Sequence, residues 1–281
     1  MNIKMMSYLL NKQKKFMISR AVSIGKELNY YEDAVLATES MIAVSDGAGG
    51  GGLFADKWAQ FLLAKLPKTP IKSFKDFDNW IDSIWEEIYS VQEVEAQKLD
   101  ALALDKFYSE GSFATIAAIW VDNDCIQWLT YGDSAVFSYD YETHELNCTV
   151  NCLSEFNKAP YLVSTNEPLN TGGFKCGIFP VSPSKIYFCA SDAISFYILA
   201  SYLIGKDGNT NQQIKEVCSS QSKNANFIFN LLSKKKFNFE SDILNKLQRA
   251  SRNKHNFSLH LNRLYKDGLI ASDDYSICFM T

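Results

Sequence analysis

Acidic residues mark five places in the chain where a short apolar run begins or ends. These places are Glu32-Asp33, Asp46-Gly47, Gly132-Asp133-Ser134, Ser191-Asp192 and Asp273-Asp274. A single aspartate in such a position is usually a helix cap or a turn residue. Five acidic motifs, each adjoining a different apolar run, are harder to explain as caps. They favour one shared site built from carboxylates.

Asp46 has the most informative neighbours of the five. It ends an apolar run and begins a glycine-rich turn, in the sequence Ala-Val-Ser-Asp-Gly-Ala-Gly-Gly-Gly-Gly over residues 43–52, and a helix is expected to follow. This arrangement brings a carboxylate, the backbone carbonyl of Gly47 and a helix N-terminus close together, which suits a divalent cation and a phosphate. No Gly-Lys-Ser/Thr follows the glycines, which excludes a P-loop.

The chemistry of these motifs is that of a metal centre. Carboxylates that converge in one cleft repel one another unless cations lie between them. The five motifs contain neither histidine nor cysteine, and ligation by oxygen alone favours Mg²⁺ or Mn²⁺ over zinc. Two such ions can ionise a water molecule and neutralise a phosphoryl group under attack. Hydrolysis of a phosphate ester is the reaction that this chemistry suits best.

The apolar patterning predicts the elements that position the motifs. Strands are expected at residues 16–25, 34–37, 41–44, 112–121, 125–131, 135–139, 146–150, 185–190 and 275–280. Helices are expected at 53–66, at 77–104 with Asp78 as N-cap, at 193–204 ending at Gly205, at 227–232 and, as one helix or a helix pair, at 242–265. Residues 151–180 hold three prolines and a Gly-Gly pair, which predicts an irregular loop. This order favours one α+β domain over residues 1–281, with helices covering antiparallel sheets.

The composition bounds the class of protein. A hydrophobic fraction of 47% is enough for a large core, and a formal net charge of −4 gives no reason to expect nucleic acid or a membrane as a partner. Seven cysteines without metal-binding spacing are expected to be reduced thiols. No early apolar run is long enough for a signal peptide or a membrane span. These features predict a soluble, cytoplasmic protein.

The motifs resemble those of the metal-dependent Ser/Thr protein phosphatases of the 2C type. Tyr31-Glu32-Asp33 resembles the family's Asn-Glu-Asp, and residues 44–50 resemble its Asp-Gly-X-Gly-Gly turn. The other matches are Gly111-Ser112-Phe113-Ala114 with Gly-Ser-Thr-Ala, Gly132-Asp133-Ser134 with Gly-Asp-Ser, Ser191-Asp192-Ala193 with Ser-Asp-Gly, and Asp273-Asp274-Tyr275-Ser276 with Asp-(Asn/Asp)-X-Thr. Each motif is short, but six in the correct order, from about Ser19 to Thr281, are specific.

The resemblance implies a fold and an activity. The fold would be an α-β-β-α sandwich, with two antiparallel sheets packed face to face between helix pairs. Residues 151–180 would form a variable flap beside the site. The activity would be Mg²⁺- or Mn²⁺-dependent hydrolysis of phosphoserine and phosphothreonine in a phosphorylated protein, with a metal-bridging hydroxide as the attacking group.

The resemblance also implies a role for each acidic residue. Catalysis would depend on Asp46, which would bridge two ions, and on Asp192 and Asp273, which would complete the first metal site. The carbonyl of Gly47 would bind one ion, and Glu32 would hold the second. Asp133 and Asp192 would share a weaker third metal site. Asp33 and Asp274 would support the metal ligands without binding an ion themselves.

Several positions depart from the family's pattern, and they concern the substrate more than the metals. Leu28 stands where the family commonly has an arginine that binds the substrate phosphate, so Arg20 or Lys26 would take that role. Ala48 stands where animal-type enzymes have a histidine as general acid, and Ala193 replaces a glycine. These departures leave two alternatives open: a catalytically weak phosphatase-fold protein that regulates or binds phosphopeptides, and a metal-dependent hydrolase of a small phosphorylated molecule.

Overall fold

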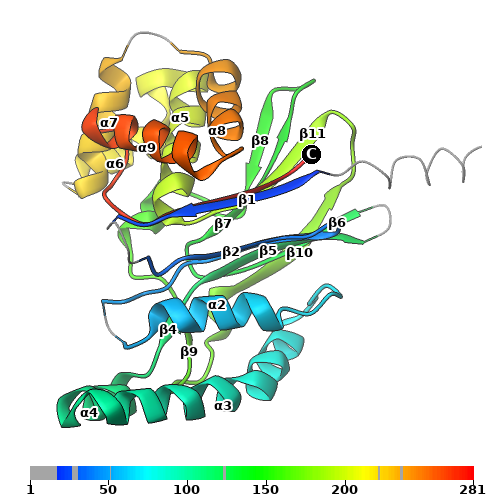
Figure 1. Ribbon diagram of the computed structural model, residues 1–281. Helices are drawn as coiled ribbons and strands as arrows, with labels where there is room; N and C mark the ends of the chain where they lie inside the picture. The colour runs from blue at the N-terminus through cyan, green and yellow to red at the C-terminus, as the bar shows by residue number, and fades with distance from the viewer. Residues whose placement is uncertain (1–17, 27–30, 51, 123–124, 221, 235–236) are drawn as a thin grey trace, which may run out of the picture.

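Two antiparallel sheets lie face to face at the centre of the molecule, with a layer of helices on each outer side (Figure 1). The computed structural model describes residues 18–26, 31–50, 52–122, 125–220, 222–234 and 237–281. The predicted α+β sandwich is confirmed. Each helical layer holds more than the expected pair, because α2 to α4 cover one sheet and α5 to α9 cover the other.

Each sheet has five strands. The first sheet has the order β1 (Ser19–Ile24), β12 (Tyr275–Met280), β11 (Lys185–Ala190), β7 (Ala135–Asp140) and β8 (Glu145–Cys148). The second sheet has the order β10 (Phe174–Pro180), β6 (Cys125–Tyr131), β5 (Ile116–Asp122), β3 (Met41–Ser45) and β2 (Ala34–Ala37). A two-stranded sheet joins β4 (Phe113–Ala114) to β9 (Val163–Ser164).

The helices follow the chain in two groups. The first group is α2 (Ala55–Lys65), α3 (Phe74–Leu99) and α4 (Ala101–Glu110). The second group is α5 (Asp192–Asp207), α6 (Gln212–Ser219), α7 (Lys223–Ser233), α8 (Asn245–Ala250) and α9 (Lys254–Lys266), with a π-helical turn, η4 (Phe239–Leu244), before α8. In the described part of the chain, no helix combines the length and the apolar character that crossing a membrane requires.

Three hydrophobic clusters fill the three interfaces between layers. The cluster between the sheets contains Ile42 and Val44 of β3 and Cys278 of β12. The neighbouring residues of the same strands point the other way: Ala43 packs toward α2 and α3, and Phe279 packs toward α5. Both faces of these strands are therefore buried, which explains why they read as continuous apolar runs rather than as alternating ones.

The predicted helix at 77–104 is wrong in its extent. It begins earlier, because the hydroxyl of Ser73, and not the side chain of Asp78, caps it by accepting a hydrogen bond from the amide of Asp76 (3.1 Å). It ends before Asp100, whose carboxylate accepts a hydrogen bond from the amide of Ala103 (2.7 Å) and so begins α4. Local side-chain bonds of this kind compete with helix continuation, and an apolar stripe does not reveal them.

The irregular loop predicted for residues 151–180 is wrong at its C-terminal end. There the seven-residue strand β10 pairs with β6 along its whole length, and before it the segment also contains the two-residue strand β9. Proline is tolerated at the edge of a sheet, and Pro180 ends this edge strand. At Gly177 a Cβ atom would approach the Trp128 ring to 2.5 Å. Of the prolines and glycines that signalled a loop, Pro180 is the one that lies in β10.

Smaller differences concern element boundaries. The strand predicted at 112–121 is interrupted at Thr115, which separates β4 from β5. α5 continues past Gly205 and ends at Gly208, whose φ of +59° favours glycine. The segment 242–265 is divided between η4, α8 and α9, and α6 and α7 account for the helical content before it. Of the strand predicted at 16–25, residues 16 and 17 lie outside the described residues.

We expect the interface between the sheets to carry much of the stability. Ile119→Ala should lower the free energy of unfolding by about 2–5 kcal/mol, because it opens a cavity where the side chain is fully buried. Ile178→Ala is the matched control, since Ile178 on edge strand β10 is 60% exposed and its truncation should cost less than about 1 kcal/mol. Urea unfolding of both variants measures the difference. Equal losses would contradict this assignment of the core.

Candidate metal centre

The acidic motifs lie together at one end of the sandwich. Asp46 follows β3 and Asp192 follows β11, whereas Asp133 precedes β7, Asp273 precedes β12 and the Glu32-Asp33 pair precedes β2. Neighbouring strands are antiparallel, so the last residue of β3 pairs with the first of β2, and the last residue of β11 pairs with the first of β7. The sheets thus gather motifs that are more than 200 residues apart in sequence.

The pKa of Asp46 reflects how closely the carboxylates approach one another. Burial is the largest cause that raises this pKa well above its ordinary value. The negative charges of Asp33, Asp192, Asp133 and Asp273 raise it further. Charges from four separate parts of the chain therefore act on one carboxylate.

Burial and charge repulsion also raise the pKa values of Asp192 and Asp133. Burial, followed by repulsion from Asp133 and Asp273, raises the pKa of Asp192 well above its ordinary value, although the amide of Ala193 lowers it. Burial also raises the pKa of Asp133 to about 6, with a further contribution from Asp273. A cation placed among these oxygens would favour the ionised form of each.

Asp33 differs from the others because it is sealed inside the protein. It is only 1% exposed, and neither of its carboxylate oxygens makes a hydrogen bond. Burial raises its pKa to about 7, repulsion from Asp274 and Asp273 adds to the rise, and the nearby Ser276 hydroxyl opposes it. The acidic side chains of the five motifs that remain half-exposed to solvent are those of Glu32, Asp46, Asp133, Asp192 and Asp273.

The glycine-rich turn after Asp46 packs directly on Glu32. A Cβ atom at Gly49 would lie 1.8 Å from the Glu32 carboxylate, and one at Gly47 would lie 2.6 Å from the Glu32 carbonyl. The amide of Gly49 donates a hydrogen bond to that carboxylate (3.3 Å). Glycine is needed here because any side chain would push Glu32 away from Asp46.

Thr115 joins two of the acidic turns, and the sequence pattern did not single it out. Its amide donates to the carbonyl of Asp46 (2.8 Å), and its carbonyl accepts a hydrogen bond from the Ser45 hydroxyl (2.7 Å). Its own hydroxyl lies 2.7 Å from that of Ser134, which follows Asp133. The strand break at Thr115 thus holds the Asp46 turn against the Asp133 turn. A threonine inside an otherwise apolar run was the one available signal.

Backbone hydrogen bonds fix the other two aspartate motifs. The amide of Ser191 donates to the carbonyl of Ser276 (3.0 Å), and the amide of Ser276 donates to the hydroxyl of Ser191 (3.1 Å). This exchange ties the segment before Asp192 to the strand that follows Asp273. Both carboxylates therefore emerge from one rigid junction between β11 and β12.

Asp274 acts as a clamp on the connection between β1 and β2. Its carboxylate accepts a hydrogen bond from the amide of Lys26 (2.8 Å) and another from the amide of Glu32 (2.5 Å). The two amides belong to opposite ends of the connection. Asp274 thereby holds the backbone of Lys26 and Glu32 in place.

Lys26 faces the carboxylates, whereas Arg20 is set back from them. Burial lowers the pKa of Lys26, but the charges of Asp273, Asp274, Glu32 and Asp46 outweigh it, so that the net shift is upward. Arg20 pairs with Phe279, four residues along β12 from its first residue, which is about 13 Å from the acidic end. Leu28, at the position where the family has arginine, lies outside the described residues.

The donor set fits divalent cations, although the side chains are not drawn together around one. Among the described residues, no three carboxylate, imidazole or thiol groups are arranged to hold a single ion as they stand. The orphaned oxygens of Asp33 and the mutual repulsion at Asp46 are what an oxygen-ligated cation would relieve. Side-chain rotation, without movement of the strands, would be the adjustment required.

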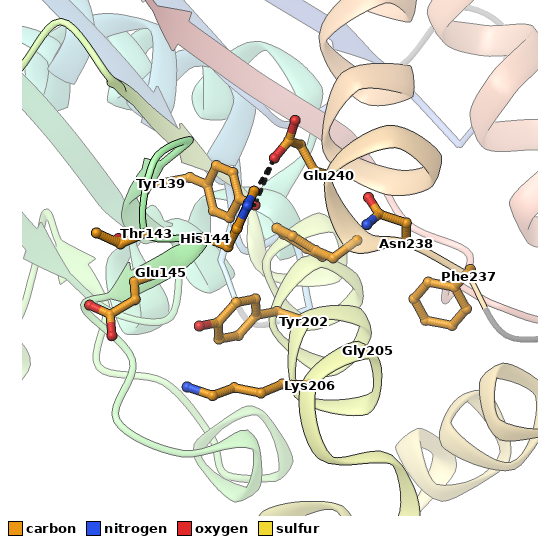
Figure 2. A pocket seen from close by; sticks show the side chains of 11 residues that line it. Tyr139, Thr143, His144, Glu145, Tyr202, Gly205, Lys206, Phe237, Asn238 and Glu240 are labelled. Carbon is orange, nitrogen blue, oxygen red and sulfur yellow. Dashed lines mark hydrogen bonds and ion pairs between the residues drawn. The ribbon is translucent and has the colours of Figure 1, made fainter.

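Figure 2 shows a separate hollow, whose lining includes none of these carboxylates. It has a volume of about 660 Å³ and is lined by Tyr139, Tyr202 and Glu240, among others. Glu240 accepts a hydrogen bond from the Tyr139 hydroxyl (3.2 Å) and pairs with His144 (3.1 Å). Tyr139 is six residues from Asp133 along β7, or about 20 Å. The hollow is therefore no part of the acidic site.

The carboxylate cluster predicts an unusual pH dependence for the metal-free protein. Asp133 binds its proton more tightly in the folded state than in the unfolded chain, so its contribution to stability falls as pH rises from 4 through about 6. The free energy of unfolding of Asp133→Asn should be about 1–2 kcal/mol higher than that of wild type at pH 8, and this difference should shrink at pH 4.5. Urea unfolding with a chelator present measures both.

Asp140→Asn, at the other end of β7, is the control of opposite sign. The amide of Glu142 is the first cause that lowers the pKa of Asp140, so its contribution is present above the ordinary aspartate pKa and is lost in acid. This variant should be less stable than wild type at pH 8. An Asp133→Asn variant that gains nothing at pH 8 would contradict the electrostatic account.

Comparison with known proteins supports the fold alone. No protein-family model matches the sequence, and no curated protein matches it. One solved structure that this chain resembles is the catalytic domain of the serine/threonine protein phosphatase PstP in complex with two manganese ions. Its sequence is 14% identical to that of this chain, and the TM-score is 0.53 over 94% of this chain and 97% of that one. The serine/threonine phosphatase Stp1 from Staphylococcus aureus is 12% identical, with a TM-score of 0.52 over 95% of each chain. PppA, a regulatory component of a secretion system in Pseudomonas aeruginosa, is 14% identical, with a TM-score of 0.50 over 95% of this chain and 97% of that one. The chain therefore has the fold of the metal-dependent Ser/Thr protein phosphatases of the 2C type.

Proposed function

We propose that the protein is a Mg²⁺- or Mn²⁺-dependent phosphatase that removes phosphate from phosphoserine and phosphothreonine in proteins. The observation that carries the proposal is the convergence of the acidic motifs on Asp46, at raised pKa, in a phosphatase fold. Carboxylates that are buried so close together are stabilised as anions by cations placed among them. Phosphate-ester hydrolysis is the chemistry that such cations serve.

The proposal assigns metal ligands by position. Asp46 would bridge two ions, the Gly47 carbonyl and the Asp192 and Asp273 carboxylates would complete the first site, and Glu32 would serve the second. A weaker third ion would lie between Asp133 and Asp192, which repel each other in the metal-free protein. When bound, the ions would supply a nucleophilic water at neutral pH and screen the charge of the phosphoryl group.

The chain's own residues would orient the substrate around that centre. Lys26, whose backbone amide donates a hydrogen bond to Asp274, would attract a phosphate toward Asp46 and Asp273. Ala48 carries no proton donor, so the leaving hydroxyl of the substrate would take its proton from solvent. Asp33 and Thr115 would hold the ligands in place without touching the substrate.

Two residues expected to lie near the substrate, Lys26 and Ala48, favour the alternative of a catalytically weak phosphopeptide-binding protein. A lysine binds phosphate as a point charge and lacks the paired donors of arginine. Ala48 removes a proton donor that some relatives of this fold use. Turnover, rather than binding, distinguishes a phosphatase from a phosphopeptide-binding protein. Comparing the turnover of a small ester with that of a phosphopeptide distinguishes a small-molecule hydrolase from a protein phosphatase.

Removal of Asp46 is the decisive test of the proposed function. With Mn²⁺, wild type should hydrolyse p-nitrophenyl phosphate and a phosphothreonine peptide, and Asp46→Ala should lose at least about 100-fold in kcat, because the ions lose their shared ligand. Asp82→Ala, an exposed aspartate on α3, should behave as wild type. Calorimetry should show Mn²⁺ binding to wild type that Asp46→Ala has lost.

Three outcomes of this test are distinct. Turnover that survives Asp46→Ala would rule out the proposed centre. Tight phosphopeptide binding to wild type without any turnover would establish the alternative. Turnover of the small ester without turnover of the phosphopeptide would point to a small phosphorylated substrate.

Lys26 should contribute to the reaction through the substrate phosphate. We expect Lys26→Ala to lower kcat/KM by about 10-fold to 100-fold, since a charge-assisted contact with the phosphate is lost. Lys26→Arg should retain more activity than Lys26→Ala because it keeps the charge. Lys68→Ala, an exposed lysine between α2 and α3, is the control. Unchanged kinetics of Lys26→Ala would show that another cation binds the phosphate.

A further inference from the structure

The edges of the two sheets, formed by β1 and β2, lie one over the other (Figure 1). A groove of about 600 Å³ opens along these edges, next to the acidic site. Its apolar wall includes Val22 of β1, Ala34 of β2 and Leu63 of α2. Arg252 and Lys254, at the junction of α8 and α9, form its opposite rim. We call this feature the edge groove.

The edge groove adjoins the candidate metal centre through Asp33 and Tyr31. Asp33 lines it and also acts electrostatically on Asp46. Tyr31 lines it as well, precedes the proposed ligand Glu32, and lies with its ring 4.9 Å from the ammonium group of Lys254. A chain leaving the metal centre would therefore meet the basic rim within a few residues.

The basic rim stands out in an acidic protein. Arg252 and Lys254 are exposed, and neither forms an ion pair with any residue that the structure describes. Asp33 is the one acidic residue in the described lining, and it is buried. The groove therefore presents positive charge to solvent beside a centre that is strongly negative.

The helix that carries Lys254 adds to this potential. α9 begins with Lys254 and His255 and has no acidic residue in its first turn. The N-terminus of a helix is its positive end, where stability alone would favour aspartate or glutamate. Lys254 is therefore placed against the preference of the helix, and its charge adds to that of the helix dipole.

The shape of the edge groove fits an extended peptide. β1 and β2 are each the last strand of their sheet in the described part of the chain, so each has one side without a strand partner. An extended segment can bond to such an edge through its backbone while its side chains meet pockets and charges. Nucleic acid is a poor alternative, because the carboxylates next to the groove would repel its phosphates.

We propose that the edge groove binds an acidic segment next to the phosphorylated residue of the substrate. The substrates would then be phosphoproteins with aspartate or glutamate within about five residues of the phosphate, since an extended chain spans about 3.3 Å per residue. Arg252 and Lys254 would recognise the carboxylates, and the apolar wall would take the intervening side chains. The inference rests on the proposed phosphatase function and adds a substrate class to it.

Three phosphothreonine peptides test this specificity with Mn²⁺ present. One has neutral flanks, one has two glutamates on the N-terminal side, and one has two on the C-terminal side. Wild type should prefer one acidic peptide over the neutral one by about five-fold in kcat/KM, and 0.5 M salt should abolish most of the preference. The double variant Arg252→Glu/Lys254→Glu should reverse the preference.

Matched controls separate recognition from damage to the protein. The double variant should hydrolyse p-nitrophenyl phosphate like wild type, and its melting temperature should not fall, because glutamate suits the first turn of α9. Lys266→Glu, an exposed residue at the other end of α9, should keep the preference. A wild type without preference for either acidic peptide, or a double variant that keeps the preference, would overturn the inference.

Binding measurements keep the inference testable apart from the proposed function. If p-nitrophenyl phosphate is not turned over in an Asp46-dependent way, the proposed function fails. The labelled peptides can still be titrated with wild type and the double variant by fluorescence anisotropy. Tighter binding of an acidic peptide to wild type alone would support the groove. Equal affinity of the two proteins for every peptide would refute it.

Discussion

Repulsion between carboxylates is the constraint to which the rest of the structure responds. Two like charges 4 Å apart cost about 4 kcal/mol at an effective dielectric constant of 20. A typical domain is stable by only about 5–15 kcal/mol. A cluster that raises the pKa of Asp46 through four neighbouring aspartates can persist only on a rigid framework. The three packed interfaces of the sandwich provide that framework, because strands buried on both faces cannot move apart independently.

The residues between the carboxylates form a set of short tethers. Thr115 joins the Asp46 turn to the turn of Asp133, and Ser191 joins β11 to β12. Asp274 closes the connection that brings Glu32 forward. Each tether uses a backbone group as well as a side chain, so the positions of the acids are fixed by the main chain. What remains adjustable is the rotation of each carboxylate, which is the freedom that an entering cation needs.

The sequence predicted the sandwich and most strands because their apolar runs are long and separated by turn residues. It predicted the convergence of the acidic motifs because each stands at a strand end. It did not predict the tethers, since a serine or threonine gives no sign of its distant partner. It also failed where Pro180 in β10 was taken as a loop signal, and where Asp100 divides two helices within one apolar stripe. In each case a local side-chain or edge effect overrode the periodicity.

Holding metals and recognising substrates place different demands on the molecule. The acidic motifs adjoin strand ends, whereas Ala48 and Lys26 lie in the connections between strands. A change at an acidic motif is expected to disturb the adjoining sheet as well, because each motif stands next to a strand end. The rim residues Arg252 and Lys254 are exposed at a helix junction, where substitution costs little stability. The proposed specificity can therefore change without disturbing the acidic cluster.

The clamp at Asp274 also has a consequence for the order of events during synthesis. It bonds to residues 242 and 248 positions earlier in the chain, and β12 is the strand that β1 pairs with in the first sheet. Until the ribosome has released this segment, β1 has no neighbour and the connection holding Glu32 has no clamp. A nascent chain with only its first half folded would carry Asp46 without Asp192 or Asp273. The acidic cluster can thus be completed only after nearly all of these residues have been made.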